Sequence, residues 1–135
     1  MQYLLDTNTC VDLMRSHPRV VSRMSRLTPA DCVISTISSY ELFTGVAKCA
    51  SPTKEKAKVD QLLSTIVELP FDMAAAREAG RIRALLETLG QMIGPYDVLL
   101  SGQALAAQLT LVTANVKEFQ RVPGLTVENW QILPP

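Results

Sequence analysis

The chain has 135 residues, with 13 Lys plus Arg and 13 Asp plus Glu, so its formal net charge is zero. This length fits one domain with a real hydrophobic core, and an apolar content of 47% argues against disorder. The sequence lacks the pattern of a signal peptide, and no apolar stretch is long enough to span a bilayer. We therefore expect residues 1–135 to form a single soluble, cytoplasmic domain without a membrane partner.

A neutral balance of charge is unusual for a protein that binds nucleic acid, but it does not exclude that class. If four acidic residues gather in one pocket, 13 basic residues face nine acidic ones elsewhere, and the remaining surface carries about +4. Cys10, Cys32 and Cys49 are odd in number and lack the spacing of a metal site. We expect these cysteines to be reduced and mostly packed.

The first predicted element is a buried strand, Tyr3-Leu4-Leu5, which ends at the carboxylate of Asp6. Thr7 and Asn8 follow as candidate N-caps of a short helix over residues 8–15. At this position Asp6 would lie at the carboxyl edge of a parallel sheet, where open α/β folds place ligands. From this stretch alone, a capping role and a functional role for Asp6 are equally well supported.

A second helix is expected after the break at His17-Pro18, with the arginines 19, 23 and 26 on its solvated face. The next predicted strand is residues 32–35. Ser38 or Ser39 can cap the helix that follows it and runs to about Cys49. Glu41 lies on this helix among mostly apolar positions, which favours a functional role over that of a surface glutamate.

The middle of the chain is predicted to contain a helix, a strand and a second, longer helix. Residues 50–53 are predicted to form a loop, and Lys54 is expected to begin a helix whose core face includes Val59. A strand is expected at residues 66–69. Asp72 then caps a helix that ends at Gly90, a typical C-terminal stop.

The last third of the chain places another carboxylate at the start of a helix. Pro95 suits a first helical position, so Asp97 falls in the first turn of an apolar helix that reaches Gln108. Strands are predicted at residues 110–113 and near 126–127, joined by a loop and a short turn. Alternation of strands and helices along the whole chain predicts a three-layer α/β/α sandwich around a mostly parallel sheet of about five strands.

Several polar residues follow strands or begin helices, so they are expected to converge at one edge of the sheet. They are Asp6, Glu41, Asp97, Thr113, Asn115 and Glu118. Two carboxylates about 4 Å apart repel by about 4 kcal/mol at an effective dielectric of 20, so a cluster of them calls for a cation. Oxygen ligands select Mg²⁺ or Mn²⁺, and such a site suits phosphodiester hydrolysis.

The sequence resembles the PIN-domain ribonucleases, in particular the VapC toxins of bacterial toxin–antitoxin pairs. The resemblance covers nearly the whole chain and rests on four motifs: LLDTN at 4–8, SSYELFTGVAK at 38–48, IGPYDVLLSGQAL at 93–105 and LVTANVKEFQRVPGLTVENW at 111–130. Through these motifs the family's acids correspond to Asp6, Glu41 and Asp97, and its strand-end hydroxyl to Thr113. Asn115 stands where many PIN domains carry a fourth acid.

The resemblance implies a PIN-like sheet of order 3-2-1-4-5 and an endoribonuclease that depends on Mg²⁺, with Mn²⁺ as a substitute. It implies metal binding by Asp6, Asp97 and Glu41, with Asn115 and Glu118 helping through water or a weak second ion. It further implies a homodimer, inhibition by a cognate antitoxin protein, and an RNA substrate. The subgroup that this chain resembles cuts initiator tRNA at the anticodon stem-loop.

Two alternatives remain open on the sequence. Asp6 followed by Thr7 would suit a phosphatase with an aspartyl nucleophile, although such enzymes usually carry a second acid where this chain has Asn8. A non-catalytic PIN module could keep the acids only to bind an arginine of a partner. Histidine-based cleavage is disfavoured, because His17 is the only histidine.

Overall fold

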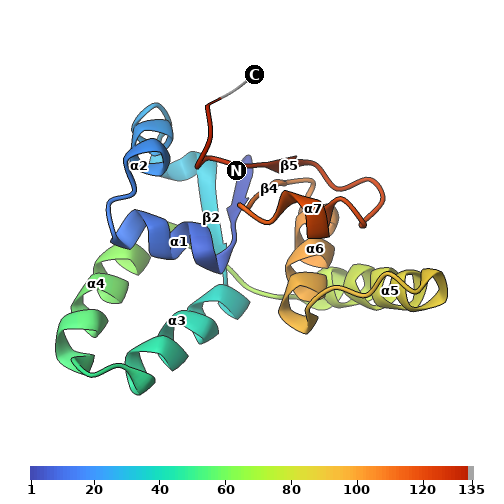
Figure 1. The fold of residues 1–135 in the computed structure, drawn as a ribbon, viewed down its shortest axis with the longest axis horizontal. Helices are drawn as coiled ribbons and strands as arrows, with labels where there is room; N and C mark the ends of the chain where they lie inside the picture. The colour runs from blue at the N-terminus through green and yellow to red at the C-terminus, as the bar shows by residue number, and fades with distance from the viewer. Residues whose placement is uncertain (134–135) are drawn as a thin grey trace.

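A five-stranded parallel sheet lies at the centre of the computed structural model, which describes residues 1–133 (Figure 1). The strand order is β3-β2-β1-β4-β5, and every neighbouring pair is parallel. The strands are β1 (Tyr3–Leu5), β2 (Cys32–Ser35), β3 (Val67–Leu69), β4 (Thr110–Val112) and β5 (Val127–Glu128). The predicted strand order and fold class are confirmed.

Helices connect successive strands, as parallel pairing requires. They are α1 (Thr7–Met14), α2 (Pro18–Ser25), α3 (Thr36–Lys48), α4 (Pro52–Thr65), α5 (Met73–Leu89), α6 (Pro95–Ala107) and α7 (Val116–Phe119), with a short 3₁₀ turn, η1 (Pro29–Asp31). None of the helices in residues 1–133 is long and apolar enough to cross a membrane.

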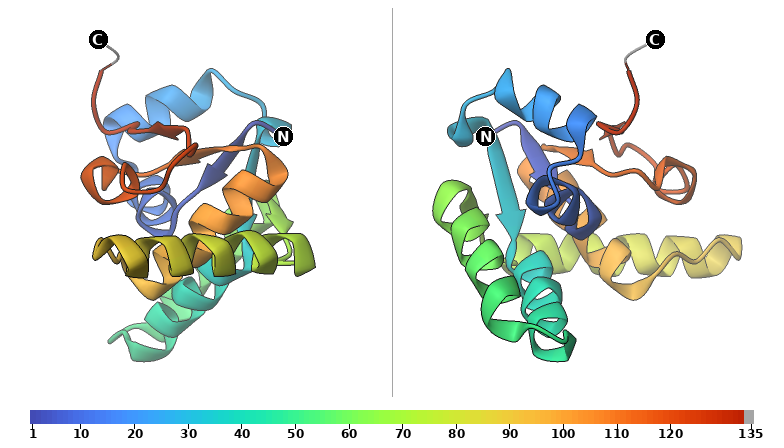
Figure 2. Two further views of the ribbon diagram at one scale, coloured as in Figure 1. Left: turned by 90° about the vertical axis from the view of Figure 1, so that its right-hand side faces the viewer. Right: turned by 60° about the vertical axis from the view of Figure 1, so that its left-hand side comes forward.

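Two hydrophobic clusters, one on each face of the sheet, give the molecule its three layers. On one face Leu4 packs with residues of α5 and α6, and on the other face Leu5 packs with residues of α1 to α4. Figure 2 shows α5 packed against α6 and α3 packed against α4. Alternating side-chain direction along β1 explains this division, and complete burial of each leucine contributes about 1.5–3 kcal/mol.

Three helices begin at residues other than those predicted. Asp6 caps α1, as one of its two open interpretations expected, and the candidate caps Thr7 and Asn8 lie inside the helix. Ser35 caps α3 by accepting a hydrogen bond from the Ile37 backbone N–H at 3.0 Å, so Ser38 and Ser39 lie inside the helix. Asp6 directly follows β1 and Ser35 ends β2, so each of them caps the next helix without an intervening loop. Helix α4 begins at Pro52, within the predicted loop.

Other sequence-based assignments are confirmed. The Asp72 side chain accepts from the Ala75 backbone N–H at 2.9 Å, and Gly90 ends α5 in the left-handed conformation with φ of 64°. Cys10, Cys32 and Cys49 are free thiols, and the first two are buried. The register of β1 with β4, which pairs Leu5 with Val112, places Asp6 beside Thr113 at the carboxyl edge of the sheet.

Candidate active site

Asp6 is a buried carboxylate at the junction of β1 and α1. Its Oδ1 atom accepts a hydrogen bond from the Thr9 backbone N–H at 2.8 Å, and its side chain is held by Thr113 as well. Only 5% of the residue is exposed. Burial raises the pKa of Asp6 above its ordinary value, and the hydrogen bonds from Thr113 and Thr9 oppose this rise. Asp6 therefore caps a helix and also faces the site.

Thr113 positions Asp6 from the end of β4. The residue is fully buried, and its Oγ1 atom accepts from the Asn115 backbone N–H at 3.0 Å. Because this hydroxyl accepts from the backbone, its own proton is free to be donated to the Asp6 carboxylate. The arrangement fixes the Asp6 side chain from a second strand of the sheet.

Asp97 lies in the first turn of α6, and its pKa is shifted by the other acids of the site. The pKa of Asp97 is raised to about 7, first by burial and then by the negative charge of Glu118, a hydrogen bond to Glu118, and the charges of Asp6 and Glu41. Nearby negative charges favour the neutral form of a carboxyl group. Asp97 therefore shares one electrostatic environment with Glu118, Asp6 and Glu41, and its direct partner among them is Glu118.

Glu118 lies on α7 and is held in place by two hydrogen bonds. Its Oε1 atom accepts from the Gly94 backbone N–H at 2.8 Å, and its Oε2 atom accepts from the Asn115 side-chain amide. The Gly94 hydrogen bond is the main reason why the pKa of Glu118 lies below its ordinary value. A Cβ atom at Gly94 would lie 3.1 Å from Asp97 Oδ2, so the glycine lets the backbone approach both acids closely.

Glu41 approaches the site from α3. Its Oε1 atom accepts a hydrogen bond from Thr7 Oγ1 at 2.7 Å, which ties α3 to the first residue of α1. The side chain is partly buried, and its charge is felt at Asp97. Thr7 therefore positions an acid, a role that its interpretation as a helix cap did not anticipate.

The six predicted site residues lie at the same edge of the sheet, but they do not form a tight ligand group. Within residues 1–133, no three His, Cys, Asp or Glu side chains are arranged closely enough to hold one ion together. The predicted grouping of Asp6, Glu41 and Asp97 is therefore looser than expected. The reason is that one Asp6 oxygen caps α1 while Glu41 is bound to Thr7.

Comparison with known proteins identifies the fold family. The model of the PIN domain family matches residues 3–125. The tRNA(fMet)-specific endonuclease VapC of Salmonella typhimurium is 35% identical over 130 residues, which cover 96% of this chain and 98% of that protein. The chain belongs to the VapC ribonucleases of the PIN-domain family.

Other relatives of this VapC chain agree along its whole length. Ribonuclease VapC2 of Rickettsia felis is 37% identical over 132 residues, covering 96% of this chain and 98% of the relative. The crystal structure of DNA-bound VapBC from Salmonella typhimurium matches with a TM-score of 0.92 and 36% identity, covering 96% of this chain and 98% of that one. VapBC2 from Rickettsia felis, bound to a promoter DNA fragment, matches with a TM-score of 0.89 and 35% identity. The match covers 96% of this chain and 99% of that one.

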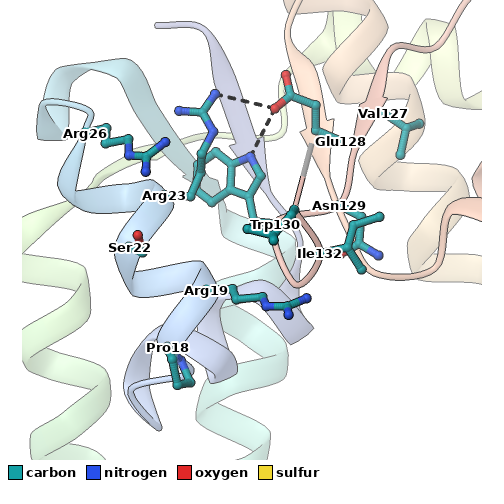
Figure 3. Close-up of a pocket in the computed structure, with 11 residues that line it drawn as sticks. Pro18, Arg19, Ser22, Arg23, Arg26, Val127, Glu128, Asn129, Trp130 and Ile132 are labelled. Carbon is teal, nitrogen blue, oxygen red and sulfur yellow. Dashed lines mark hydrogen bonds and ion pairs between the residues drawn. The ribbon is translucent and has the colours of Figure 1, made fainter. Parts of the chain in front are cut away.

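A separate cavity of about 660 Å³ in this VapC chain lies between α2 and the C-terminal segment, and none of the site acids lines it (Figure 3). The Arg23 guanidinium lies 5.6 Å from the ring centroid of Tyr3 and 5.4 Å from that of Trp130, and 3.6 Å from a Glu128 carboxylate oxygen. The prediction of a merely solvated face is therefore wrong for Arg23. Its cation–π contacts and ion pair brace the C-terminal segment against β1.

His17 takes no part in the VapC site. Its Nδ1 atom accepts from the Val20 backbone N–H at 3.5 Å and caps α2, so the single histidine of the chain has a structural role. Sequence reasoning missed Gly94 and Thr7 as positioning residues. The available signals were their places close to Asp97 and directly after Asp6.

Proposed function

We propose that this VapC chain is the toxin of a type II toxin–antitoxin pair, a Mg²⁺-dependent endoribonuclease with tRNA as its substrate class. Initiator tRNA, cut in the anticodon stem-loop, is the specific candidate. Two relatives that align over almost the whole chain support this proposal through their names, one as a tRNA(fMet)-specific endonuclease and one as a ribonuclease. VapBC complexes among the similar structures support an antitoxin partner.

The single structural observation that carries the proposal is the crowding of acids around Asp97, which lies with Glu118 against the backbone of Gly94. The pKa of Asp97 reaches about 7 because the side chain is partly buried and faces Glu118, Asp6 and Glu41. A fold that gathers like charges in this way places its carboxylates at a cost to stability, which is typical of functional sites. The candidate ligands offer carboxylate oxygens, and this donor set fits Mg²⁺ or Mn²⁺ rather than Zn²⁺.

Asp6 and Asp97 are the residues that would hold the ion, with Glu41 contributing from the other side of the site. Mg²⁺ in proteins is often bound by one or two carboxylates and several waters, so a looser set of acids is sufficient. When bound, the ion would polarise a phosphoryl oxygen of the RNA and lower the pKa of an attacking water. Mn²⁺ is the expected substitute.

The remaining residues orient these acids. Thr113 holds the Asp6 carboxylate, and Thr7 holds Glu41 through its 2.7 Å hydrogen bond. Glu118 is held by the Gly94 backbone N–H and accepts a hydrogen bond from Asp97 when the Asp97 carboxyl is protonated. A side chain that is already fixed loses little conformational freedom when substrate binds, so these contacts favour catalysis through preorganisation.

The antitoxin partner is proposed from the VapBC complexes among the similar structures. A cognate antitoxin protein would bind and inhibit the toxin, and the toxin would act as a homodimer in the cytoplasm. A phosphatase mechanism is less well supported, because the Asp6 oxygen Oδ1 already caps α1 and the residue is only 5% exposed to solvent. A nucleophile must be open to its substrate.

Cleavage of defined transcripts tests the proposal. Purified protein is incubated with initiator tRNA and with elongator methionine tRNA, each with Mg²⁺, Mn²⁺ or EDTA. We expect cleavage of initiator tRNA with either ion and none with EDTA. Asp97→Asn should abolish cleavage, whereas Asp60→Asn, which changes a surface acid paired with Lys56 on α4, should not. Cleavage that persists in EDTA would contradict the metal dependence, and equal cleavage of both transcripts would contradict the choice of substrate.

A further inference from the structure

Two tyrosine side chains meet across the gap between α3 and α6. The ring centroids of Tyr40 and Tyr96 are 5.6 Å apart, the ring planes are inclined by 56°, and the Tyr96 hydroxyl donates to the Tyr40 hydroxyl at 3.2 Å. Tilted aromatic pairs of this kind are favourable beyond the area that they bury. The contact therefore holds the two rings in a defined mutual orientation.

This tyrosine pair adjoins the acids of the site along the sequence and in space. Tyr40 directly precedes Glu41 on α3, and Tyr96 directly precedes Asp97 on α6. In Figure 1 the beginnings of α3 and α6 lie below the strands, on the side of the sheet edge where α1 starts. A group bound against the pair would consequently lie next to the region that Glu41 and Asp97 face.

The pair remains open to solvent in spite of its internal contact. Tyr40 is 54% exposed and Tyr96 is 40% exposed. Because Tyr40 accepts the hydrogen bond from Tyr96, its own hydroxyl proton is available to an outside acceptor. Two aromatic rings that remain exposed to solvent bury little area in the fold, so they stabilise it little. Their open faces can stack on the π-face of a ligand.

We propose that Tyr40 and Tyr96 form a stacking platform for one unpaired base of the RNA substrate, next to the bond that is cut. Aromatic rings stack on any base, and each such contact is worth about 1–3 kcal/mol. The platform would splay a nucleotide out of a loop and hold the neighbouring phosphate over the acids. This inference rests on the proposed ribonuclease function and adds the residues that position the substrate.

The test combines protein variants with altered RNA. The substrate is the shortest RNA hairpin that the wild-type protein cleaves, made also with single abasic nucleotides on either side of the cleaved bond. Tyr40→Leu and Tyr96→Leu remove the aromatic face, whereas Tyr40→Phe and Tyr96→Phe keep it. Phe43→Leu is the matched control, because Phe43 is 48% exposed on the same helix but lies outside the tyrosine pair. Each variant is checked by thermal melting and by sedimentation at the assay concentration.

The leucine variants should raise KM by roughly 5- to 100-fold and change kcat by less than about threefold, and the phenylalanine variants should resemble wild type. With an abasic nucleotide at the stacked position, the KM of wild type should rise as much as the leucine substitutions raise it with intact RNA. The KM of the leucine variants should not rise further with the abasic RNA. The proposal would be overturned if the leucine and phenylalanine variants lost activity equally, or if Phe43→Leu lost as much as the tyrosine-to-leucine variants. It would also be overturned if the losses from the leucine variants and from every abasic RNA were additive. A change in sedimentation that accounts for the loss would overturn it too, since the pair would then join two copies of the chain.

Failure of this inference can be told from failure of the ribonuclease proposal. If wild type cuts the hairpin and Asp97→Asn does not, the function stands whatever the tyrosine variants do. If wild type cuts no RNA under any metal condition, the proposed function itself is contradicted.

Discussion

Asp97 and Glu118 are neighbouring carboxyl groups whose pKa values move in opposite directions. Burial and the charge of Glu118 raise the pKa of Asp97 to about 7, whereas hydrogen bonds from Gly94 and Asn115 keep the pKa of Glu118 below its ordinary value. The proton that the pair retains near neutral pH therefore resides on Asp97. Its consequences can be measured without any substrate.

The stability of the metal-free protein should fall as pH rises from about 4 to about 7. In this window the folded state holds a proton on Asp97 that the unfolded chain has lost, so rising pH favours unfolding. Because Asp97 is only partly buried, we expect this contribution to the free energy of unfolding to be about 1–2 kcal/mol. Thermal melts in EDTA at pH 5 and pH 7.5 measure it.

Asp97→Asn should remove most of this pH dependence and stabilise the metal-free protein near neutral pH, because it relieves the repulsion. Mg²⁺ at about 100 times its dissociation constant should add roughly 2.7 kcal/mol to the wild type at pH 7.5 and much less to the variant. A variant that is less stable than wild type in EDTA, together with no Mg²⁺ shift in wild type, would show that these acids do not act as a cluster.

Gly94→Ala should reduce RNA cleavage by about tenfold or more while costing less than about 1 kcal/mol of stability. The backbone at Gly94 has φ of −56°, which alanine adopts freely, but its Cβ would press on Asp97 Oδ2 at 3.1 Å. Gly80→Ala is the control, because nothing lies within 4 Å of its added Cβ on α5. That change should raise stability by about 0.5–1 kcal/mol and leave cleavage unaltered. Equal activities of the two variants would argue against a role for the close approach at Gly94.

Asp6→Asn, Glu41→Gln and Asp97→Asn should each lower cleavage by at least about 100-fold with the fold retained. Asn caps a helix about as well as Asp, so the first change should keep the start of α1 intact. Losses in the double variants should fall far short of the product of the single losses, since the residues act as one unit. Multiplicative losses, measured as kcat/KM on one RNA, would count against a shared site.

Basic side chains on or next in sequence to the elements that carry the acids should contribute to RNA affinity in a salt-dependent way. Lys48, Lys54 and Lys117 are close in sequence to elements that carry the acids. Changing each to Gln should weaken binding and reduce the slope of log affinity against log salt by up to about one for each phosphate that the lysine neutralises. A Lys117→Gln protein with unaltered affinity and slope would remove that residue from the proposed RNA-binding surface.

The fold was largely predictable because the strands of this chain are short apolar runs separated by amphipathic helices. Leu4 and Leu5 are completely buried as their position in a central strand predicts, and the strand order follows from the family resemblance. Helix starts were less predictable. Asp6 directly follows β1, Ser35 ends β2 and each caps a helix, and sequence alone does not indicate that no loop intervenes.

The sequence predicted that the candidate residues would lie at one edge of the sheet, but it did not predict their contacts. Strand ends and helix starts indicated Asp6, Asp97 and Thr113, because parallel strands bring such positions to one edge. The hydrogen bond from Gly94 to Glu118 joins residues 24 positions apart, and that from Thr7 to Glu41 joins residues 34 apart. Such distant pairs depend on how helices pack on the sheet, which local sequence patterns do not encode.

Mapping of new RNA ends in total RNA tests the central claim most directly. Wild-type protein and Asp97→Asn are incubated with RNA from a bacterial host, each with Mg²⁺ and with EDTA, and every new end is sequenced. We predict a small set of sites, concentrated in tRNA loops, that appear only with wild type and Mg²⁺. The same ends appearing in EDTA or with Asp97→Asn, or no new ends under any condition, would contradict a metal-dependent ribonuclease site built on these acids.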